Sequence, residues 1–460
     1  MERKIEEKLR AWKSQQKRKA LMIRGPRQVG KSYIIREFGK KNYRKIIEIN
    51  FEDNPDFKTI FENNLSADRL FLTLSYMLEG VESFDDCLLF LDEIQGCESA
   101  LSAIKPLVSD GRCDIICSGS QLGNTIGVER LTPLGYVEII HMEPMDFEEF
   151  LWAIGFSHDK TNTIRKHIRT MEPFDRAVLR KLNDLFLRYV TIGGMPEAVE
   201  SFVRTGLYSE SYKIQSSIFS LLRDDILRYC ESSTDKDRIS QCISSIPRQL
   251  SRETGNSFRY SDVSMNTKYG RREYGASISW LVNAGFIDIC YNLEEISEPF
   301  VTKADGNTFK IYVKDTGMMT MMLGPGIGRG IVEGDFKINN GALIENAVAS
   351  ALVKNGYRLH YYSNLGKRIE IDFVANLNGR LVAIEVKSGR KKSARSLNKL
   401  AEIGQDVDVR IKISDSNLSV DENGIYHIPL FGASFFDECV PLELPSLDIS
   451  DLLNDKGPLS

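Results

Sequence analysis

A glycine-rich segment near the start of the chain has the residue types and spacing that hold a phosphate. It fits the pattern G-x-x-x-x-G-K-[ST] throughout and consists of Gly25, Pro26, Arg27, Gln28, Val29, Gly30, Lys31 and Ser32. An apolar run at 20–24 precedes it and a helix-like stretch at 33–38 follows, so the backbone N–H groups are expected to curl around a phosphate at a helix N-terminus. There Lys31 reaches the β and γ phosphates and Ser32 ligates Mg²⁺. The alternative is a glycine-rich turn that carries Lys-Ser by chance.

Two carboxylates follow the apolar run at 88–91, which is typical of a central parallel strand. Asp92 and Glu93 lie where that strand ends, the position at which α/β sheets bind ligands. We expect Asp92 to hold Mg²⁺ through water and Glu93 to polarise the attacking water as a general base. An acidic pair that simply caps a buried strand is the alternative. Combined with the phosphate loop, the pair predicts hydrolysis of a nucleoside triphosphate.

Three more apolar runs, at 45–50, 114–118 and 137–141, are separated by helix-length stretches, which predicts a five-stranded parallel α/β sheet. The run at 114–118 leads into a polar turn. Ser118 or Ser120 therefore either senses the γ-phosphate or caps a helix, and the sequence leaves both roles open.

A second group of acidic residues lies far down the chain. Glu345 falls on a helical pattern, Asp372 on an alternating strand, and Glu385 and Lys387 on a second strand that can form a hairpin with the first. Three carboxylates around one point define an oxygen-ligand site for Mg²⁺ or Mn²⁺, and the lysine can orient or deprotonate a water that attacks a phosphodiester. The basic segment at 388–395 suits backbone phosphates. A solvent-facing hairpin with alternating charges is the alternative.

Two family resemblances follow from these motifs. The chain resembles AAA-type P-loop ATPases of the AAA_14/DUF4143 family, and the segments that carry this resemblance are GPRQVGKS at 25–32, LLFLDEIQ at 88–95, SGSQLG at 118–123, EPMDFEEFL at 143–151, GGMPEAV at 193–199 and KDTGMM at 314–319. The resemblance implies ATP and Mg²⁺ as cofactors. The order of the acidic residues resembles the PD-(D/E)xK nuclease superfamily, with Glu345, Asp372, Glu385 and Lys387 at the matching positions.

One departure from the family concerns the arginine that completes many such ATP sites. Relatives carry Gly-Arg just before the fifth strand, whereas this chain has Gly135 and Tyr136. Arg130 is the nearest substitute. Whether a neighbouring subunit supplies an arginine, and so whether the chain forms a homo-oligomer, is left open.

The remaining patterns give the domain organisation. We expect a P-loop ATPase core at 1–150, a helical lid at 151–230, a winged-helix-like connector at 231–308, a restriction-endonuclease-like α/β domain at 309–435 and an acidic tail at 436–460. Gly193 and Gly194 in the lid are either a hinge or a helix terminator. Arg271 and Arg272 in the connector either contact DNA or are solvated surface.

Composition limits the partners and the cellular location that we expect for the chain. The chain has 460 residues, 60 basic against 64 acidic side chains, and a net charge of -4, so any nucleic-acid contact must come from a local patch. Its eight cysteines are scattered without metal-site spacing. No apolar run approaches the roughly 18 residues that cross a bilayer, which predicts a cytoplasmic protein without a membrane partner.

These expectations combine into two hypotheses. In the first, nucleotide state controls a C-terminal nuclease-like domain that binds or cleaves DNA, with the winged helix as a second DNA contact. In the second, the chain is a nucleotide-dependent scaffold or sensor whose C-terminal domain grips nucleic acid or protein without cleaving it.

Overall fold

The structure is a computed structural model of the chain. It describes all residues except 63–64, 79, 82, 121–132, 134, 231, 253–256, 265–268, 334–340, 388–394 and 440–460.

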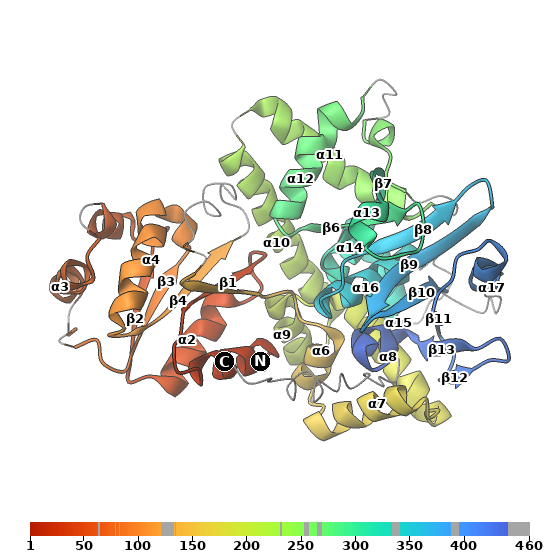
Figure 1. The fold of residues 1–460 in the computed structure, drawn as a ribbon, viewed down its shortest axis with the longest axis horizontal. Helices are drawn as coiled ribbons and strands as arrows, with labels where there is room; N and C mark the ends of the chain where they lie inside the picture. The colour runs from red at the N-terminus through yellow and green to blue at the C-terminus, as the bar shows by residue number, and fades with distance from the viewer. Residues whose placement is uncertain are drawn as a thin grey trace, which may run out of the picture.

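The first sheet has five parallel strands in the order β2-β3-β4-β1-β5 (Figure 1). Its strands are β1 (Ala20–Gly25), β2 (Lys45–Asn50), β3 (Cys87–Asp92), β4 (Asp114–Ser120) and β5 (Val137–His141). The accompanying helices are α1 (Ile5–Lys13), α2 (Lys31–Asn42), α3 (Ala67–Met77) and α4 (Glu98–Asp110), with short 3-10 turns at η1 (Pro55–Phe61) and η2 (Ile94–Gly96). Every residue of β3 is buried, as the continuous apolar run predicted. The predicted parallel α/β sheet is confirmed.

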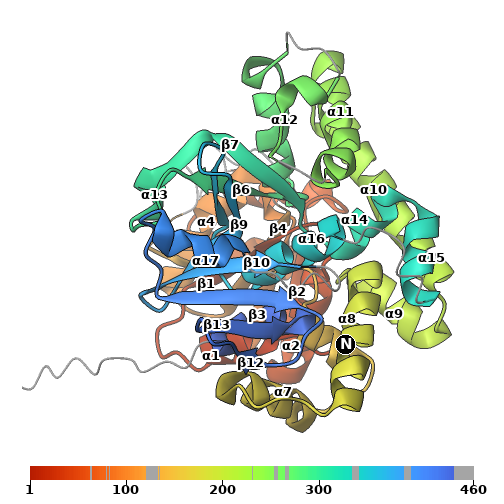
Figure 2. The ribbon, with the colours of Figure 1, turned by 90° about the vertical axis from the view of Figure 1, so that its right-hand side faces the viewer.

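A helical region follows the first sheet. It consists of α6 (Phe147–Ala153), α7 (His158–Thr170), α8 (Arg176–Ile192), α9 (Pro196–Thr205), α10 (Tyr208–Tyr229), α11 (Ser233–Leu250), the 3-10 turn η3 (Tyr260–Asp262) and α12 (Arg271–Asn283). Helices α11 and α12 pack side by side and project together at the top of Figures 1 and 2.

The second sheet has eight strands in the order β12-β13-β11-β10-β9-β8-β6-β7 and lies towards the viewer in Figure 2. Its strands are β6 (Ile287–Leu293), β7 (Ala304–Val313), β8 (His360–Asn364), β9 (Ile369–Leu377), β10 (Arg380–Val386), β11 (Val409–Ser414), β12 (Ser419–Val420) and β13 (Ile425–Pro429). The helices of this part are α13 (Phe300–Lys303), α14 (Thr316–Leu323), α15 (Pro325–Glu333), α16 (Gly341–Lys354), α17 (Arg395–Glu402) and the 3-10 segment η4 (Leu430–Glu438).

The antiparallel pair β6–β7 follows α12, where a winged helix would have its wing. Here the pair instead extends the second sheet through β8. The expected boundary between 308 and 309 therefore falls inside β7. The expected tail begins later than predicted, because Phe436 is fully buried within η4.

A tight turn brings the acidic strands of the second sheet together. Leu377 pairs with Arg380, so only Asn378 and Gly379 connect β9 to β10. Both connecting residues have positive φ, at 52° and 85°, which is the geometry that favours Asn-Gly in a two-residue hairpin. The hairpin expected between the strands of Asp372 and Glu385 is present.

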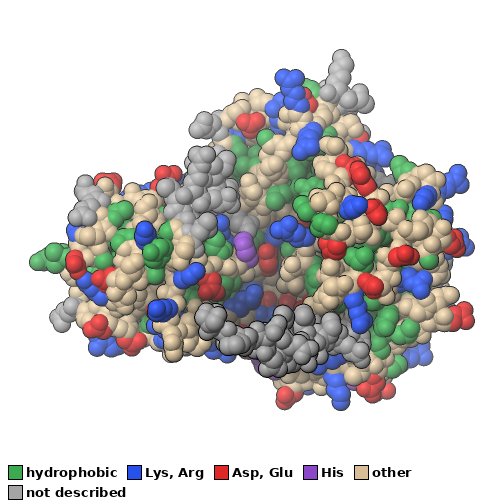
Figure 3. All heavy atoms as spheres, viewed as in Figure 1, with side chains coloured by type: hydrophobic (Ala, Val, Ile, Leu, Met, Phe, Trp, Pro, Cys, Tyr) green, Lys and Arg blue, Asp and Glu red, His purple; other side chains and the backbone are tan. Residues whose placement is uncertain are grey.

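The surface shows no charge segregation on the face in Figure 3, where Lys and Arg side chains are interspersed with Asp and Glu. Within the described ranges, no helix combines the length and the apolar character needed to span a bilayer.

Candidate nucleotide site and C-terminal carboxylate centre

The phosphate loop connects β1 to α2 at the carboxyl end of the first sheet. Gln28 and Gly30 have positive φ, at 64° and 90°, so the chain turns sharply before α2 begins at Lys31. The Lys31 ammonium is buried and donates to the carbonyl oxygens of Gly25 at 3.0 Å and Pro26 at 2.8 Å. Burial lowers the pKa of Lys31 to about 8, although the nearby carboxylates Glu93 and Asp92 oppose that shift. A cation is thus held inside the loop where phosphate oxygens would bind.

The two residues expected to hold Mg²⁺ are in contact. The Ser32 hydroxyl lies 3.0 Å from each carboxylate oxygen of Asp92, although the two residues are 60 positions apart. Asp92 is only 2% exposed, and burial raises its pKa, against the hydrogen bonds from Ser118 and Ser32. Hydroxyl and carboxylate oxygens are the donors that Mg²⁺ prefers, so these residues fit the ion that ATP requires.

Ser118 lies on β4 and contacts the carboxylate that is expected to hold Mg²⁺. Its side chain is fully buried on β4, and its hydroxyl donates to Asp92 Oδ1. Asn50, at the end of β2, donates to Asp92 Oδ2 at 3.2 Å. Ser118 and Asn50 therefore position the Asp92 carboxylate. Ser120 ends β4, and its side chain lies outside the described part of the structure.

Glu93 has a backbone conformation that side-chain-bearing residues seldom adopt, with φ 50° and ψ 48°. Such strain is typical of functional sites held by their surroundings. Gln95 donates through Nε2 to Glu93 Oε2. A Cβ on Gly119 would lie 2.9 Å from Gln95 Oε1, so the glycine leaves room for this amide. Sequence reasoning did not identify Gln95 as the residue that orients Glu93.

Arg27 ties the phosphate loop to the helical region. Its Nη1 lies 2.6 Å from Asp225 Oδ1 on α10, and its Nη2 lies 3.4 Å from Glu52 Oε1. Asp225 is 5% exposed, whereas the Arg27 side chain is 28% exposed, so this ion pair is partly buried. A cavity of about 140 Å³ borders the same loop, and its lining includes Pro26, Gln28, Met195, Leu222, Phe286 and Met318. Three regions of the chain thus meet beside the phosphate loop.

The C-terminal carboxylates are paired with lysines. Glu345 Oε1 accepts hydrogen bonds from Lys310 Nζ at 3.0 Å and from the Tyr312 hydroxyl at 2.6 Å. Lys310 also pairs with Glu370 at 2.7 Å. On the adjacent strand, Lys387 Nζ lies 2.8 Å from Glu385 Oε1.

Asp372 lies between these two groups. Its Oδ2 accepts the backbone N–H of Val386 at 2.7 Å. Burial, and then the charge of Glu345, raise the pKa of Asp372 to about 7, with Lys310 and Lys387 opposing the shift.

The predicted three-carboxylate metal site is not assembled. Among the described residues, no three His, Cys, Asp or Glu side chains are placed to hold a metal ion. Lysines lie among these carboxylates, because Lys387 pairs with Glu385 and Lys310 pairs with Glu345. Glu385 Oε2 is buried without a hydrogen-bond partner, but one such oxygen falls short of a divalent-cation site. The residues present therefore do not fit Mg²⁺ or Mn²⁺ there.

Comparison with protein families supports the nucleotide site. Residues 17–151 match AAA_14, described as an AAA domain. This part of the chain is an AAA-type P-loop domain. Residues 183–326 match a domain of unknown function, DUF8612, and residues 340–431 match another, DUF4143. The DUF4143 resemblance is thus confirmed for the C-terminal part, while GGMPEAV and KDTGMM fall in the DUF8612 match. No curated protein matches the chain.

Solved structures resemble the chain weakly. Drosophila ORC bound to DNA is 12% identical with a TM-score of 0.27, covering 72% of this chain and 95% of that one. Aeropyrum pernix ORC1 in complex with DNA is 12% identical with a TM-score of 0.28, covering 73% and 93%. AMPPCP-bound DnaA from Aquifex aeolicus is 14% identical with a TM-score of 0.26, covering 60% and 84%. These similarities are too low to support an argument about function.

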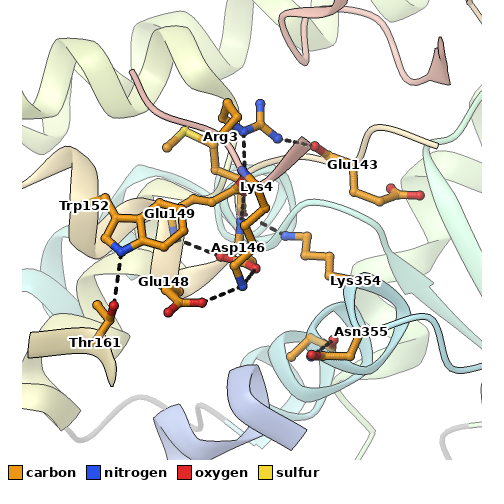
Figure 4. A network of polar contacts seen from close by, with 12 residues as sticks. Arg3, Lys4, Glu143, Asp146, Glu148, Glu149, Trp152, Thr161, Lys354 and Asn355 are labelled. Carbon is orange, nitrogen blue, oxygen red and sulfur yellow. Dashed lines mark hydrogen bonds and ion pairs between the residues drawn. The ribbon is translucent and has the colours of Figure 1, made fainter. Parts of the chain in front are cut away.

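A buried polar network joins the AAA domain to its surroundings (Figure 4). Arg3, before α1, donates to the carbonyl of Val29 in the phosphate loop at 2.9 Å, to Glu149 at 3.0 Å and to the Glu143 carbonyl at 2.7 Å. Asp146 and Glu149 form a capping box at the start of α6. The EPMDFEEFL segment therefore anchors the loop, and Arg3 is a contact that no sequence motif revealed.

Helix α16 reaches this network from the C-terminal part. Lys354, at the end of the helix, donates to the Met145 carbonyl at 3.1 Å and to the Tyr189 hydroxyl at 2.9 Å. Figure 4 shows the Lys354 side chain pointing toward the polar network. Glu345 lies on the same helix, two and a half turns earlier. One rigid element thus contacts both the AAA domain and the carboxylate centre.

The two glycines of GGMPEAV are packed against other segments. Asp315, from KDTGMM, accepts the N–H of Gly194 at 2.6 Å, and the Met145 N–H donates to the Gly194 carbonyl at 2.7 Å. A Cβ on Gly194 would lie 2.0 Å from the Met145 oxygen, and one on Gly193 would lie 2.3 Å from Asp315 Oδ1. Gly193 is also the C-cap of α8, with φ 75°, so the helix-terminator alternative is confirmed there, and close backbone approach is a further reason for glycine at both positions.

Several other residues were expected to contact the nucleotide or DNA. Arg130 and most of the basic segment, 388–394, lie outside the described residues. Arg271 and Arg272 are exposed in the first turn of α12, where Arg271 donates to Asn307 at 3.0 Å. Arg395 is exposed at the start of α17.

Proposed function

We propose that the chain binds and hydrolyses ATP in its AAA domain and that its nucleotide state controls DNA binding by the C-terminal part. The contact of Ser32 with Asp92, beside the strained Glu93, carries the hydrolytic part of this proposal. When bound, Mg²⁺ would neutralise phosphate charge between Ser32 and Asp92. Glu93, oriented by Gln95, would accept the proton of the attacking water.

Helix α16 supports the proposed control. Its Lys354 contacts the Met145 carbonyl, next to the segment that Arg3 ties to the phosphate loop. A displacement of that loop would therefore reach the helix that carries Glu345. The Arg27–Asp225 pair offers a parallel contact through α10.

DNA binding rests on basic residues near the second sheet. Arg395 on α17, together with Arg271 and Arg272 on α12, presents exposed guanidinium groups that can contact backbone phosphates. Cleavage of DNA by Asp372, Glu385 and Lys387 is the stronger form of this proposal. The pairing of Glu385 with Lys387 does not favour it.

An ATPase assay tests the hydrolytic role. Removing a general base costs about 100-fold or more in rate, so Glu93→Gln should lose that much activity while Glu98→Gln, an exposed carboxylate five positions on, should not. Equal rates for wild type and Glu93→Gln would exclude Glu93 as the base.

DNA binding is measured separately, by anisotropy of a labelled duplex with the Glu93→Gln protein in ATP or ADP. Control by nucleotide predicts different affinities in the two states, whereas equal affinities favour the scaffold, our second candidate. Plasmid incubated with Mn²⁺ and wild type, Asp372→Ala or Lys387→Ala tests cleavage. Plasmid nicking by the wild type but by neither variant would establish that the C-terminal part cleaves DNA.

A further inference from the structure

The C-terminal carboxylate centre contains a cation supplied by the chain itself. Lys310, on β7, is 1% exposed, and its ammonium lies 3.0 Å from Glu345 and 2.7 Å from Glu370. The same ammonium lies over the Tyr361 ring, 4.9 Å from its centroid. A lysine at this depth is costly unless carboxylates surround it, so these contacts are needed for the native fold.

These contacts engage one oxygen atom of each of two carboxylates that a divalent cation would need. Glu345 Oε1 accepts from both Lys310 and Tyr312, and Asp372 Oδ2 accepts from the Val386 backbone. A metal ion that bound Glu345 and Asp372 would therefore have to displace the buried Lys310 ammonium from Glu345.

The other carboxylate of the predicted site has its own lysines. Glu385 pairs with Lys387 at 2.8 Å, and its neighbour in the parallel register on β11 is Lys412, which is 4% exposed. Lysines thus accompany Glu385 as well as Glu345. The lysines therefore offset part of the repulsion that would call for a divalent cation.

We propose that Lys310 is a built-in counter-cation that takes the place of a divalent metal in this nuclease-like centre. The centre binds neither Mg²⁺ nor Mn²⁺, and the C-terminal part acts on nucleic acid by binding without metal-dependent cleavage. Lys310 is a structural cation that also fixes β7 to α16 and β9. The proposal does not depend on ATP hydrolysis, so it stands or fails independently of the AAA site.

Manganese binding to the nucleotide-free full-length chain tests it. The electron paramagnetic resonance signal of free Mn²⁺ reports the bound fraction. Wild type and Asp372→Asn should bind Mn²⁺ alike, because neither has a metal at this centre. Lys310→Met, of similar length without the charge, should gain a Mn²⁺ site about tenfold or more tighter than any in wild type. Lys310→Met with Glu345→Gln should lose that site again.

Two results would overturn the proposal. One is a Mn²⁺ site in wild type that Asp372→Asn removes. The other is a folded Lys310→Met protein that gains no Mn²⁺ site. If Lys310→Met does not fold, the double variant Lys310→Met with Glu370→Gln takes its place in the assay. This double variant removes the cation together with one carboxylate. The comparison of wild type with Asp372→Asn needs neither variant and can refute the proposal by itself.

Discussion

Replacing Gly194 by alanine should destabilise the whole chain, because this residue has no room for a side chain. An added Cβ would lie 2.0 Å from the Met145 oxygen and 2.7 Å from the Met145 nitrogen. The backbone cannot shift away without loss, since the Gly194 N–H donates to the buried Asp315 carboxylate at 2.6 Å and its carbonyl accepts from Met145 at 2.7 Å. Relieving the clash therefore breaks both hydrogen bonds.

The cost follows from those two bonds. A hydrogen bond to a charged group contributes about 1.5–3 kcal/mol and a neutral one about 0.5–1.5 kcal/mol, so Gly194→Ala should lose about 2–4.5 kcal/mol before any strain is counted. Gly326→Ala is the matched control, because Gly326 is exposed on α15 with nothing near its missing Cβ, and it should gain about 0.5–1 kcal/mol. Urea unfolding followed by tryptophan fluorescence measures both. A Gly194→Ala protein with wild-type stability but altered ATPase activity would refute close packing as the reason for glycine at this position. It would favour the hypothesis that Gly194 is a hinge.

Two further predictions concern ion pairs around the AAA domain. Arg27→Gln and Asp225→Asn should each destabilise the chain, and the double variant should lose less than their sum, with a coupling energy of about 0.5–3 kcal/mol in a double-mutant cycle. For Glu148, burial alone would raise the pKa, but Arg165 and Lys4 lower it below its ordinary 4.5, so its charge stabilises the fold above that pH and ceases to do so as the pH falls through the lower folded value. The difference in melting temperature between wild type and Glu148→Gln should therefore be constant near neutral pH and shrink below pH 4.5; a difference that grows on acidification would contradict this sign.

The AAA domain was predictable from sequence because its chemistry and its strands are local signals. The apolar runs at 45–50 and 137–141 coincide with β2 and β5, and the run at 114–118 is β4 short of its last two residues. The central strand β3 is buried along its whole length, and it appears in the sequence as an uninterrupted apolar run. The phosphate loop adds fixed spacing, which is why Ser32 and Asp92 could be paired across 60 positions.

Contacts between distant polar residues could not be predicted in the same way. Arg3 lies in a charged N-terminal stretch that resembles any exposed helix, yet it is 7% exposed and bonded to Val29. Lys310 and Tyr312 alternate with apolar residues on β7, a pattern that is typical of a strand with one solvent-facing side. The alternation of side chains along a strand predicts that Lys310 and Tyr312 share one face of β7. It does not reveal that α16 covers that face with Glu345.

The carboxylate centre shows why a matching order of residues is weaker evidence than a matching loop. A phosphate loop binds through consecutive backbone N–H groups, so its spacing is sufficient to place the donors. A site built from Glu345, Asp372 and Glu385 also requires that a helix and two strands present their carboxylates to one side. Among the described residues, no three ligating side chains come together in this way. Instead, Lys310 pairs with Glu345 and Lys387 pairs with Glu385, so a lysine of the chain stands beside each of these carboxylates.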